Sequence, residues 1–141
     1  MKTTGYFCLV LTLTLSLAVF GTDQSWKRQV SNTDRERANP YSGQTDAISA
    51  GGRIFAEHCA ACHGADALGR GKRPSLRTSE VQDASDGEIF WILKHGFIRR
   101  GMPSWSSLPD ASRWQLVTYV KSLGVANPEA NSQEHAKEAQ Q

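Results

Sequence analysis

Cys59-Ala60-Ala61-Cys62-His63 is the stretch of this chain around which the fold must be built. Two cysteines separated by two residues and followed at once by a histidine form the attachment pattern of a c-type haem. The spacing lets each thiol bond one vinyl group of a single porphyrin, and it places an imidazole beside the iron. We therefore expect one covalently attached haem c, anchored by Cys59 and Cys62 and ligated by His63.

Two other interpretations of this motif have less support. A C-x-x-C pair also forms thioredoxin-like redox sites, but those sites require a βαβ context that this sequence does not show. The pair could also be half of a zinc site, but no second Cys/His pair follows at zinc spacing. Haem attachment is the interpretation that the surrounding sequence favours.

Length and charge narrow the classes of partner. The chain has 141 residues, which suits one domain, and a formal net charge of +2. No long run of like charge indicates nucleic acid or another polyanion as a partner. We therefore expect protein partners, with no nucleic acid, and contact with a membrane that is peripheral at most.

The N-terminus is typical of an exported protein. In residues 1–21, Lys2 precedes the apolar residues 6–20, and Val19 and Gly21 offer small side chains for cleavage. The alternative is an uncleaved anchor, although this segment is shorter than the ~20 apolar residues that span a bilayer. We expect a signal peptide and a periplasmic protein, which is anchored to the membrane only if the segment is retained.

The rest of the chain divides into three segments. Residues 22–44 are polar and show no helical period, so we interpret them as a linker or as an arm draped over the domain. Residues 45–125 contain the apolar periodicity and form the domain. Residues 126–141 are rich in Glu, Gln, Asn and Ala, which predicts a disordered tail.

Three helices are expected in the domain, over residues 45–59, 86–95 and 109–123. Their apolar side chains recur at helical spacing, and no alternating stretch predicts a strand. A loop rich in Gly, Ser and Arg joins the first helix to the second, and a short Gly-Met-Pro loop joins the second to the third. The fold class is therefore all-α.

The ends of the second and third helices carry recognisable signals. Ser85 and Glu88 form a capping box before the second helix, and Gly96 is a plausible stop after it. Ser107 is placed to cap the third helix, and Gly124 to end it.

A low-spin haem that transfers electrons needs a second iron ligand opposite His63. Met102 is the only methionine besides the initiator, and Gly101 and Pro103 keep it in a loop. A thioether in that position raises the haem potential relative to a second imidazole. We expect Met102 to be this ligand, rather than a methionine that fills a gap in the core.

The other three histidines are weaker candidates. His95 is the main competitor, but its place at a helix C-terminus suggests an interaction with the helix dipole instead. His58 adjoins Cys59 and would point away from an iron that His63 faces. His135 lies in the tail.

Residues 45–125 resemble the class I cytochromes c, especially the small bacterial ones with a single haem. The likeness rests on the C-x-x-C-H motif after a helix, the Pro74-Ser75-Leu76 loop, the Gly-Met-Pro loop and a C-terminal helix. The resemblance implies the cytochrome c fold, with three main helices wrapped around one covalently bound haem.

The resemblance also implies two contacts. Gly51 and Phe55 on the first helix match positions that cross Leu116 and Tyr119 on the last, where a glycine lets the two helices pack closely. Pro74 matches a proline whose backbone carbonyl accepts a hydrogen bond from the imidazole that ligates iron. Such a bond fixes the tautomer of that imidazole and strengthens it as a donor.

The function that follows is one-electron transfer by a periplasmic carrier, not enzymatic catalysis. The carrier would shuttle electrons between a dehydrogenase or respiratory complex and an oxidase. One alternative is the haem subunit of a periplasmic dehydrogenase, for example a quinoprotein. Another is a gas-binding sensor, which requires an open or labile sixth position on the iron.

The expected partners are a protein donor and a protein acceptor of electrons. Arg99 and Arg100 flank Met102, and Lys94 and Arg53 could lie near them. Together they could form a basic collar for acidic docking surfaces. They could equally be ordinary solvated surface charges.

Overall fold

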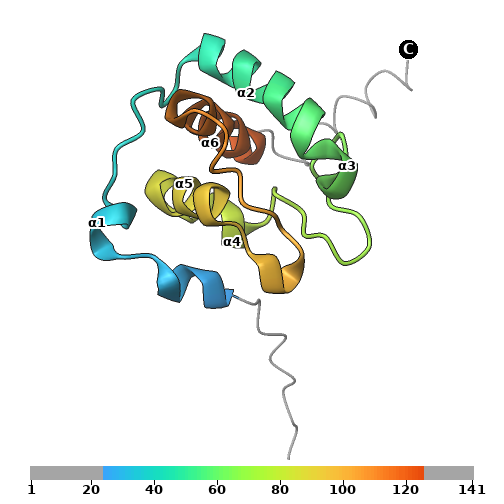
Figure 1. Cartoon of the computed structure of the whole chain (residues 1–141). Coiled ribbons are helices and arrows are strands. Elements are labelled where there is room, and N and C mark those ends of the chain that lie inside the picture. The colour runs from blue at the N-terminus through green and yellow to red at the C-terminus, as the bar shows by residue number, and fades with distance from the viewer. Residues whose placement is uncertain (1–23, 126–141) are drawn as a thin grey trace, which may run out of the picture.

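The computed structural model describes residues 24–125 and shows an all-α fold (Figure 1). Within this range no β-strand forms, and β-type pairing is limited to two isolated bridges, Arg70 with Arg73 and Phe97 with Met102. The expected signal peptide and tail lie outside the described residues. None of the helices that the structure describes is long and apolar enough to cross a bilayer. The helices, in chain order, are η1 (Gln24–Gln29), α1 (Asn32–Arg35), α2 (Thr45–His58), α3 (Ala60–His63), α4 (Ser79–Gln82), α5 (Asp86–His95), η2 (Ile98–Arg100) and α6 (Asp110–Val125).

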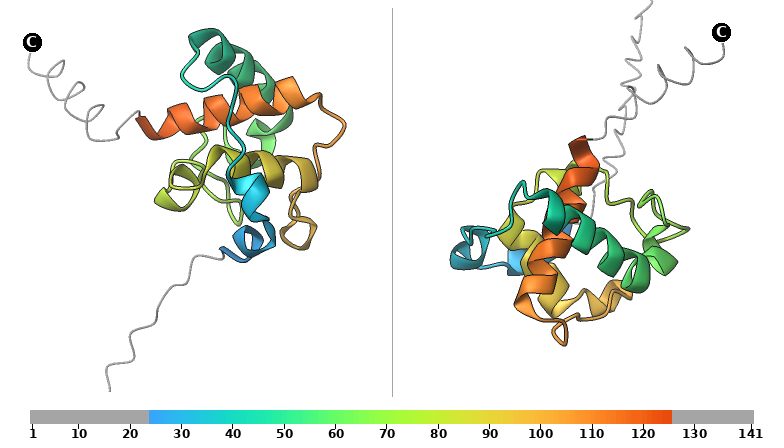
Figure 2. Two further views of the ribbon diagram at one scale, coloured as in Figure 1. Left: turned by 90° about the vertical axis from the view of Figure 1, so that its left-hand side faces the viewer. Right: turned by 90° about the horizontal axis from the view of Figure 1, so that it is seen from above.

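The two longest helices, α2 and α6, cross in direct contact, as both views of Figure 2 show. Gly51 lies at the crossing point, where a Cβ would overlap the carbonyl oxygen of Gln115 and lie 2.7 Å from Cβ of Tyr119. The rings of Phe55 and Tyr119 pack with their centroids 5.2 Å apart. The contact implied by the resemblance is therefore present, and it explains a glycine inside a helix, which costs about 1 kcal/mol relative to alanine.

Helix α5 packs against the other side of α6 and completes the core. The rings of Phe90 on α5 and Trp114 on α6 stack with their centroids 4.1 Å apart. The capping box predicted for this helix is present, because Ser85 and Glu88 each accept a hydrogen bond from the other's backbone amide. The helix ends where expected, at Gly96, whose φ is +72°.

Both end signals predicted for the third helix are wrong. Helix α6 begins at Asp110, and its first turn is closed by the amide of Arg113 donating to the carbonyl of Pro109, beyond the reach of Ser107 as a cap. The helix continues through Gly124, which does not adopt a positive φ. A Cβ on Gly124 would overlap the side-chain amide of Gln82, so this glycine permits the close approach of α4 instead of ending the helix.

The segment before α2 is part of the packed structure. It contains η1 and α1, although the sequence there shows no helical period. Val30 is buried, and a Cβ on Gly87 of α5 would overlap the carbonyl oxygen of Asp34. Arg35 forms an ion pair with Glu88 at 3.3 Å. Because these turns are short and depend on contact with α5, the local sequence carries no periodic signal for them.

The remainder of this segment reaches the aromatic core. The guanidinium of Arg37 lies 4.4 Å from the ring centroid of Phe90 and 5.3 Å from that of Trp114. The amide nitrogen of Asn39 donates to Asp86 at 2.9 Å and to Thr118 at 3.0 Å. The segment therefore forms an arm that is fixed to both α5 and α6.

Candidate functional site

The Cys59–His63 stretch forms one helical turn directly after α2. Helix α2 ends at His58, Cys59 caps it, and the short helix α3 follows. The amides of Cys62 and His63 donate to the carbonyl of Cys59 at 3.1 and 2.9 Å. Residues three apart on a helical turn share a face, so both thiols lie on the same side of this turn.

The two thiols differ in their surroundings. Cys59 is half-buried against the core, whereas Cys62 is exposed, and neither is in a disulfide. Burial, together with the neighbouring Cys62, raises the pKa of the Cys59 thiol to about 11. Cys59 is therefore a neutral thiol at physiological pH. Because neither cysteine is in a disulfide, both sulfur atoms are available for covalent attachment.

His63 is oriented by a backbone carbonyl. Its Nδ1 lies 3.0 Å from the carbonyl oxygen of Pro74, which is the contact that the resemblance implies. A carbonyl oxygen can only accept, so the proton of the neutral ring lies on Nδ1. The lone pair on Nε2 is then left for a metal.

The turn that returns Pro74 to His63 depends on Gly69. The amide of Gly69 donates to the carbonyl of His63 at 2.7 Å, and its φ is +88°. A Cβ at this position would lie 2.6 Å from the carbonyl oxygen of Arg73 and 2.7 Å from the amide nitrogen of Ser75. Residues 64–76, which we call the His63 loop, therefore require glycine here for two separate reasons.

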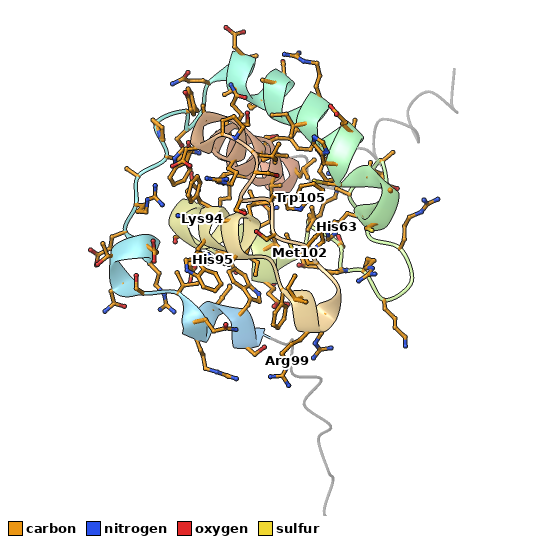
Figure 3. The ribbon with its side chains drawn as sticks, viewed as in Figure 1. His63, Lys94, His95, Arg99, Met102 and Trp105 are labelled. Atoms are coloured by element: carbon orange, nitrogen blue, oxygen red, sulfur yellow. The ribbon has the colours of Figure 1, made fainter. Side chains whose placement is uncertain are left out.

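Met102 lies on a second loop, residues 97–109, which we call the Met102 loop. Phe97 and Met102 exchange backbone hydrogen bonds of 2.9 and 3.2 Å, and Gly101 between them adopts the left-handed conformation with a φ of +77°. The side chain of Met102 is half-buried against the core. Figure 3 shows His63, Met102 and Trp105 on neighbouring segments of the molecule.

Arg113 of α6 binds backbone carbonyls of the Met102 loop. This residue was not among those predicted from the sequence. Its Nη1 donates to the carbonyls of Trp105 and Ser106, both at 3.0 Å, and to that of Leu108. Its side chain is only 4% exposed. A signal was present, because Arg113 is in phase with the apolar stripe of α6 that includes Val117.

Arg77 has a similar role for the His63 loop and was also missed. Its Nε donates to the carbonyl of Asp66 at 2.9 Å, and its Nη1 donates to the carbonyl of Leu123 at 3.1 Å. The loop is thereby tied to the end of α6. Both acceptors are backbone atoms, so no pattern of side chains in the sequence pointed to these contacts.

The rings of two competing histidines pack on tryptophan side chains. Nδ1 of His95 lies 2.9 Å from the carbonyl oxygen of Trp91, and the two rings stack with centroids 4.2 Å apart. The ring of His58 packs on that of Trp105 at 5.2 Å. His135 lies outside the described residues.

The four basic residues considered for a collar come from three elements, α2, α5 and η2. Arg99 and Arg100 are both on η2, but Lys94 lies apart from Arg99 in Figure 3. Arg53 is on α2, a different element. The cation that meets η2 is instead Arg73 of the His63 loop, whose Nη1 donates to the carbonyl of Arg100 at 2.8 Å.

Residues 46–120 match the family model described as cytochrome c oxidase, cbb3-type, subunit III. The chain belongs to this cytochrome c family. It is 35% identical over 85 residues to the cbb3-type cytochrome c oxidase subunit FixP of Rhizobium meliloti, covering 57% of this chain and 29% of that protein. It is 34% identical over 86 residues to subunit CcoP of Rhodobacter capsulatus, covering 54% and 29%.

A shorter relative and a solved structure are also similar to this cytochrome. Cytochrome c550 of Pseudomonas aeruginosa is 28% identical over 90 residues, covering 61% of this chain and 62% of that protein. The crystal structure of cytochrome cL from Methylophaga aminisulfidivorans matches with a TM-score of 0.54 and 24% identity, covering 84% of this chain and 83% of that one. This match confirms the all-α cytochrome c fold. The chain spans 29% of the length of each of the two oxidase subunits.

Cytochrome c domains of this kind carry covalently attached haem c. The residues present fit that group. Two free cysteines share one turn, and the imidazole of His63 has one nitrogen left for iron. Among the described residues, the exposed large apolar side chains are Leu68 on the His63 loop, 58% exposed, and Ile98 on the Met102 loop, 69% exposed. An apolar macrocycle held by these loops would remove such surface from water.

Proposed function

We propose that this chain is a periplasmic cytochrome that carries one electron at a time and is not itself an enzyme. Cys59 and Cys62 attach the haem, and His63 and Met102 are its axial ligands. The observation that carries the proposal is the contact between His63 and the carbonyl of Pro74. It fixes an imidazole in the tautomer that an iron ligand requires, on the same turn as two free thiols.

Each residue has a defined role in this proposal. The thiols of Cys59 and Cys62 would hold the haem through two thioether bonds. The Pro74 carbonyl raises the basicity of His63, and the Met102 thioether favours the reduced state. When bound, the haem supplies a reversible one-electron change at iron. With both axial positions taken by side chains, no position remains for a substrate, which supports electron transfer over catalysis.

The same proposal assigns a role to each segment of the chain. Residues 1–21 act as the signal for export, residues 45–125 form the haem domain with the arm fixed to it, and residues 126–141 form a tail. The donor is a dehydrogenase or respiratory complex, and the acceptor is an oxidase. The oxidase subunits among the relatives support the acceptor, and the apolar N-terminal stretch supports the compartment.

The test is the spectrum and potential of the mature holoprotein with changes at Met102. The wild-type oxidised form should show the weak far-red band of a thioether–iron bond. Met102→Ala should lose this band and let the reduced form bind carbon monoxide. Met102→His serves as the matched control, because it restores six-coordination with an imidazole. It should lower the potential by on the order of 100 mV, since axial ligands set haem potentials over about 0.8 V.

Two results would contradict the proposal. A spectrum that Met102→Ala leaves unchanged would show that another residue is the ligand. Wild-type protein that is high-spin and binds carbon monoxide readily would favour the gas-binding sensor instead.

A second candidate is a haem-bearing component of an oxidase assembly. The observation in its favour is the identity of about a third to two cbb3-type oxidase subunits. Purification under mild conditions separates the two candidates. A component should co-purify with an oxidase in fixed ratio, whereas a carrier should be recovered alone and should reduce an added oxidase at a rate that depends on its concentration.

A further inference from the structure

One side chain connects the two loops that carry the proposed axial ligands. Arg73 lies next to Pro74 on the His63 loop. Its Nη1 donates to the carbonyl oxygen of Arg100 on η2 at 2.8 Å. Arg100 is two residues before Met102, and Pro74 is the residue whose carbonyl orients His63. The hydrogen bond therefore links the environments of both ligands.

Both ends of this link are fixed by the backbone. On one side, Arg70 and Arg73 exchange backbone hydrogen bonds of 3.2 and 2.9 Å, which hold the Cα from which the guanidinium extends. On the other side, the amide of Gly101 donates to the carbonyl of Ile98 at 2.8 Å. Because backbone hydrogen bonds fix the Cα of Arg73 and the carbonyl of Arg100, a hydrogen bond between these residues resists the separation of the two loops.

Gly101 leaves the space that the guanidinium occupies. A Cβ on Gly101 would lie 2.6 Å from Nη1 and 3.2 Å from Nη2 of Arg73. The φ of +77° at Gly101 also favours glycine. Arg73 as a whole is half-buried, but its hydrogen bond to Arg100 is exposed, so the bond acts mainly through its charged donor and its fixed geometry.

We propose that Arg73 is a positioning residue that holds the Met102 loop to the His63 loop and so keeps Met102 on the iron. This inference rests on the proposed function, because it assumes that Met102 is an axial ligand. For the thioether to leave, residues 98–102 must move away, and the hydrogen bond from Arg73 to Arg100 opposes that movement. Arg73 does not touch the ligand itself and acts through the backbone of the loop.

The experiment measures how often Met102 leaves. Imidazole binds the oxidised holoprotein only after the thioether has dissociated, so the rate at saturating imidazole reports that dissociation. Arg73→Gln should raise this rate about tenfold, the factor expected for losing one hydrogen bond from a charged donor. Arg73→Lys keeps the charge and one donor, so its rate should fall between wild type and Arg73→Gln. Arg70→Gln removes an exposed guanidinium from the same loop and should stay within about twofold of wild type.

Gly101→Ala offers an independent route to the same link. Its Cβ should displace the guanidinium and also raise the rate. In the Arg73→Gln background the clash with the guanidinium is already gone and only the strain of the positive φ remains, so Gly101→Ala should add less than it does alone. Full additivity of the two changes would overturn the link.

The remaining outcomes are distinct. Equal imidazole rates in Arg73→Gln and Arg70→Gln, with a normal far-red band in the wild type, would overturn the proposed role of Arg73 but would leave Met102 as an iron ligand. Absence of that band from the wild type would overturn both this inference and the ligand role of Met102. An unchanged imidazole rate in Arg73→Gln, combined with a midpoint potential that differs from wild type only at pH values where a carboxylate titrates, would also overturn the proposed role of Arg73. That last result would assign Arg73 to a haem propionate instead.

Discussion

The His63 loop and the Met102 loop are each held by backbone and side-chain hydrogen bonds, but they differ in their main support. In the His63 loop the amides of Ala67 and Gly69 donate to the carbonyls of Gly64 and His63, and the amide of Leu76 donates to the carbonyl of Ala67. The Met102 loop has its Phe97–Met102 backbone pair, and the amide of Trp105 donates to the carbonyl of Leu93 at 2.9 Å, but its later part is also bound by a buried side chain. Arg113 binds three of its carbonyls, and the hydroxyl of Ser104 donates to the carbonyl of Lys94 at 2.6 Å.

This difference shows what fixes the position of each proposed ligand. The position of His63 depends on which residues can adopt positive φ values, including Gly69 at +88° and the buried Ala67 at +60°. The position of Met102 depends on long side chains that come from elsewhere in the fold. Substitutions should therefore act on the His63 loop through backbone fit and on the Met102 loop through lost hydrogen bonds.

The largest effect is expected from Arg113→Met. It removes the donor to the carbonyls of Trp105, Ser106 and Leu108, and it should lower the free energy of unfolding by about 3 kcal/mol. Part of the loss is offset, because Nε of Arg113 is buried without a partner. Urea unfolding of the holoprotein measures the change, and the far-red band should weaken in the same variant.

Asp110→Asn is the control for this substitution. Asp110 pairs with Arg113 but its side chain is 65% exposed, so losing the charge should cost less than about 1 kcal/mol. If both variants were equally destabilised, the ion pair would matter more than the carbonyls. The proposed contrast between the loops would then lose its main support.

Gly69→Ala should have the next largest effect, on the other loop. The positive φ costs about 1 kcal/mol for alanine, and the overlap with the backbone of residues 73–75 brings the total to about 2 kcal/mol. Displacing the Pro74 carbonyl should also weaken its hydrogen bond to His63 and raise the midpoint potential, because a less basic imidazole stabilises Fe(III) less.

Gly71→Ala separates the two causes. Gly71 has a φ of +57°, but nothing lies within 4 Å of a Cβ placed there. The change should cost about 1 kcal/mol or less and leave the potential as it is. A shift in potential equal to that of Gly69→Ala would indicate a general loosening of the loop, rather than a specific displacement of Pro74.

Features with local causes could be predicted from the sequence. The bounds of α5 follow from Ser85, Glu88 and Gly96, all of which act within one turn of the helix. The crossing of α2 and α6 was implied by the resemblance at Gly51, where the lack of a Cβ is itself the cause. The attachment motif is equally local, since five consecutive residues define it.

Features that depend on distant partners could not be predicted in this way. Arg37 is separated by more than fifty residues from the ring of Phe90 that it covers, and nothing in its own surroundings marks it as part of the core. The apolar stripe of α6 marks Arg113 as buried, but nothing in the sequence marks the backbone carbonyls that it binds. The arm and the support of the Met102 loop both belong to this class, so the structure was needed to find them.

Pro74→Ala is expected to have the smallest effect, and it tests the contrast most directly. The hydrogen bond to His63 comes from the backbone carbonyl, which alanine keeps, so the spectrum and the potential should not change. Stability should fall by only about 0.5 kcal/mol, because alanine gives the unfolded chain more freedom. If the potential instead moved as far as in Gly69→Ala, the proline ring would be needed to hold the carbonyl. The position of His63 would then depend on the ring of Pro74 as well as on the backbone fit of its loop.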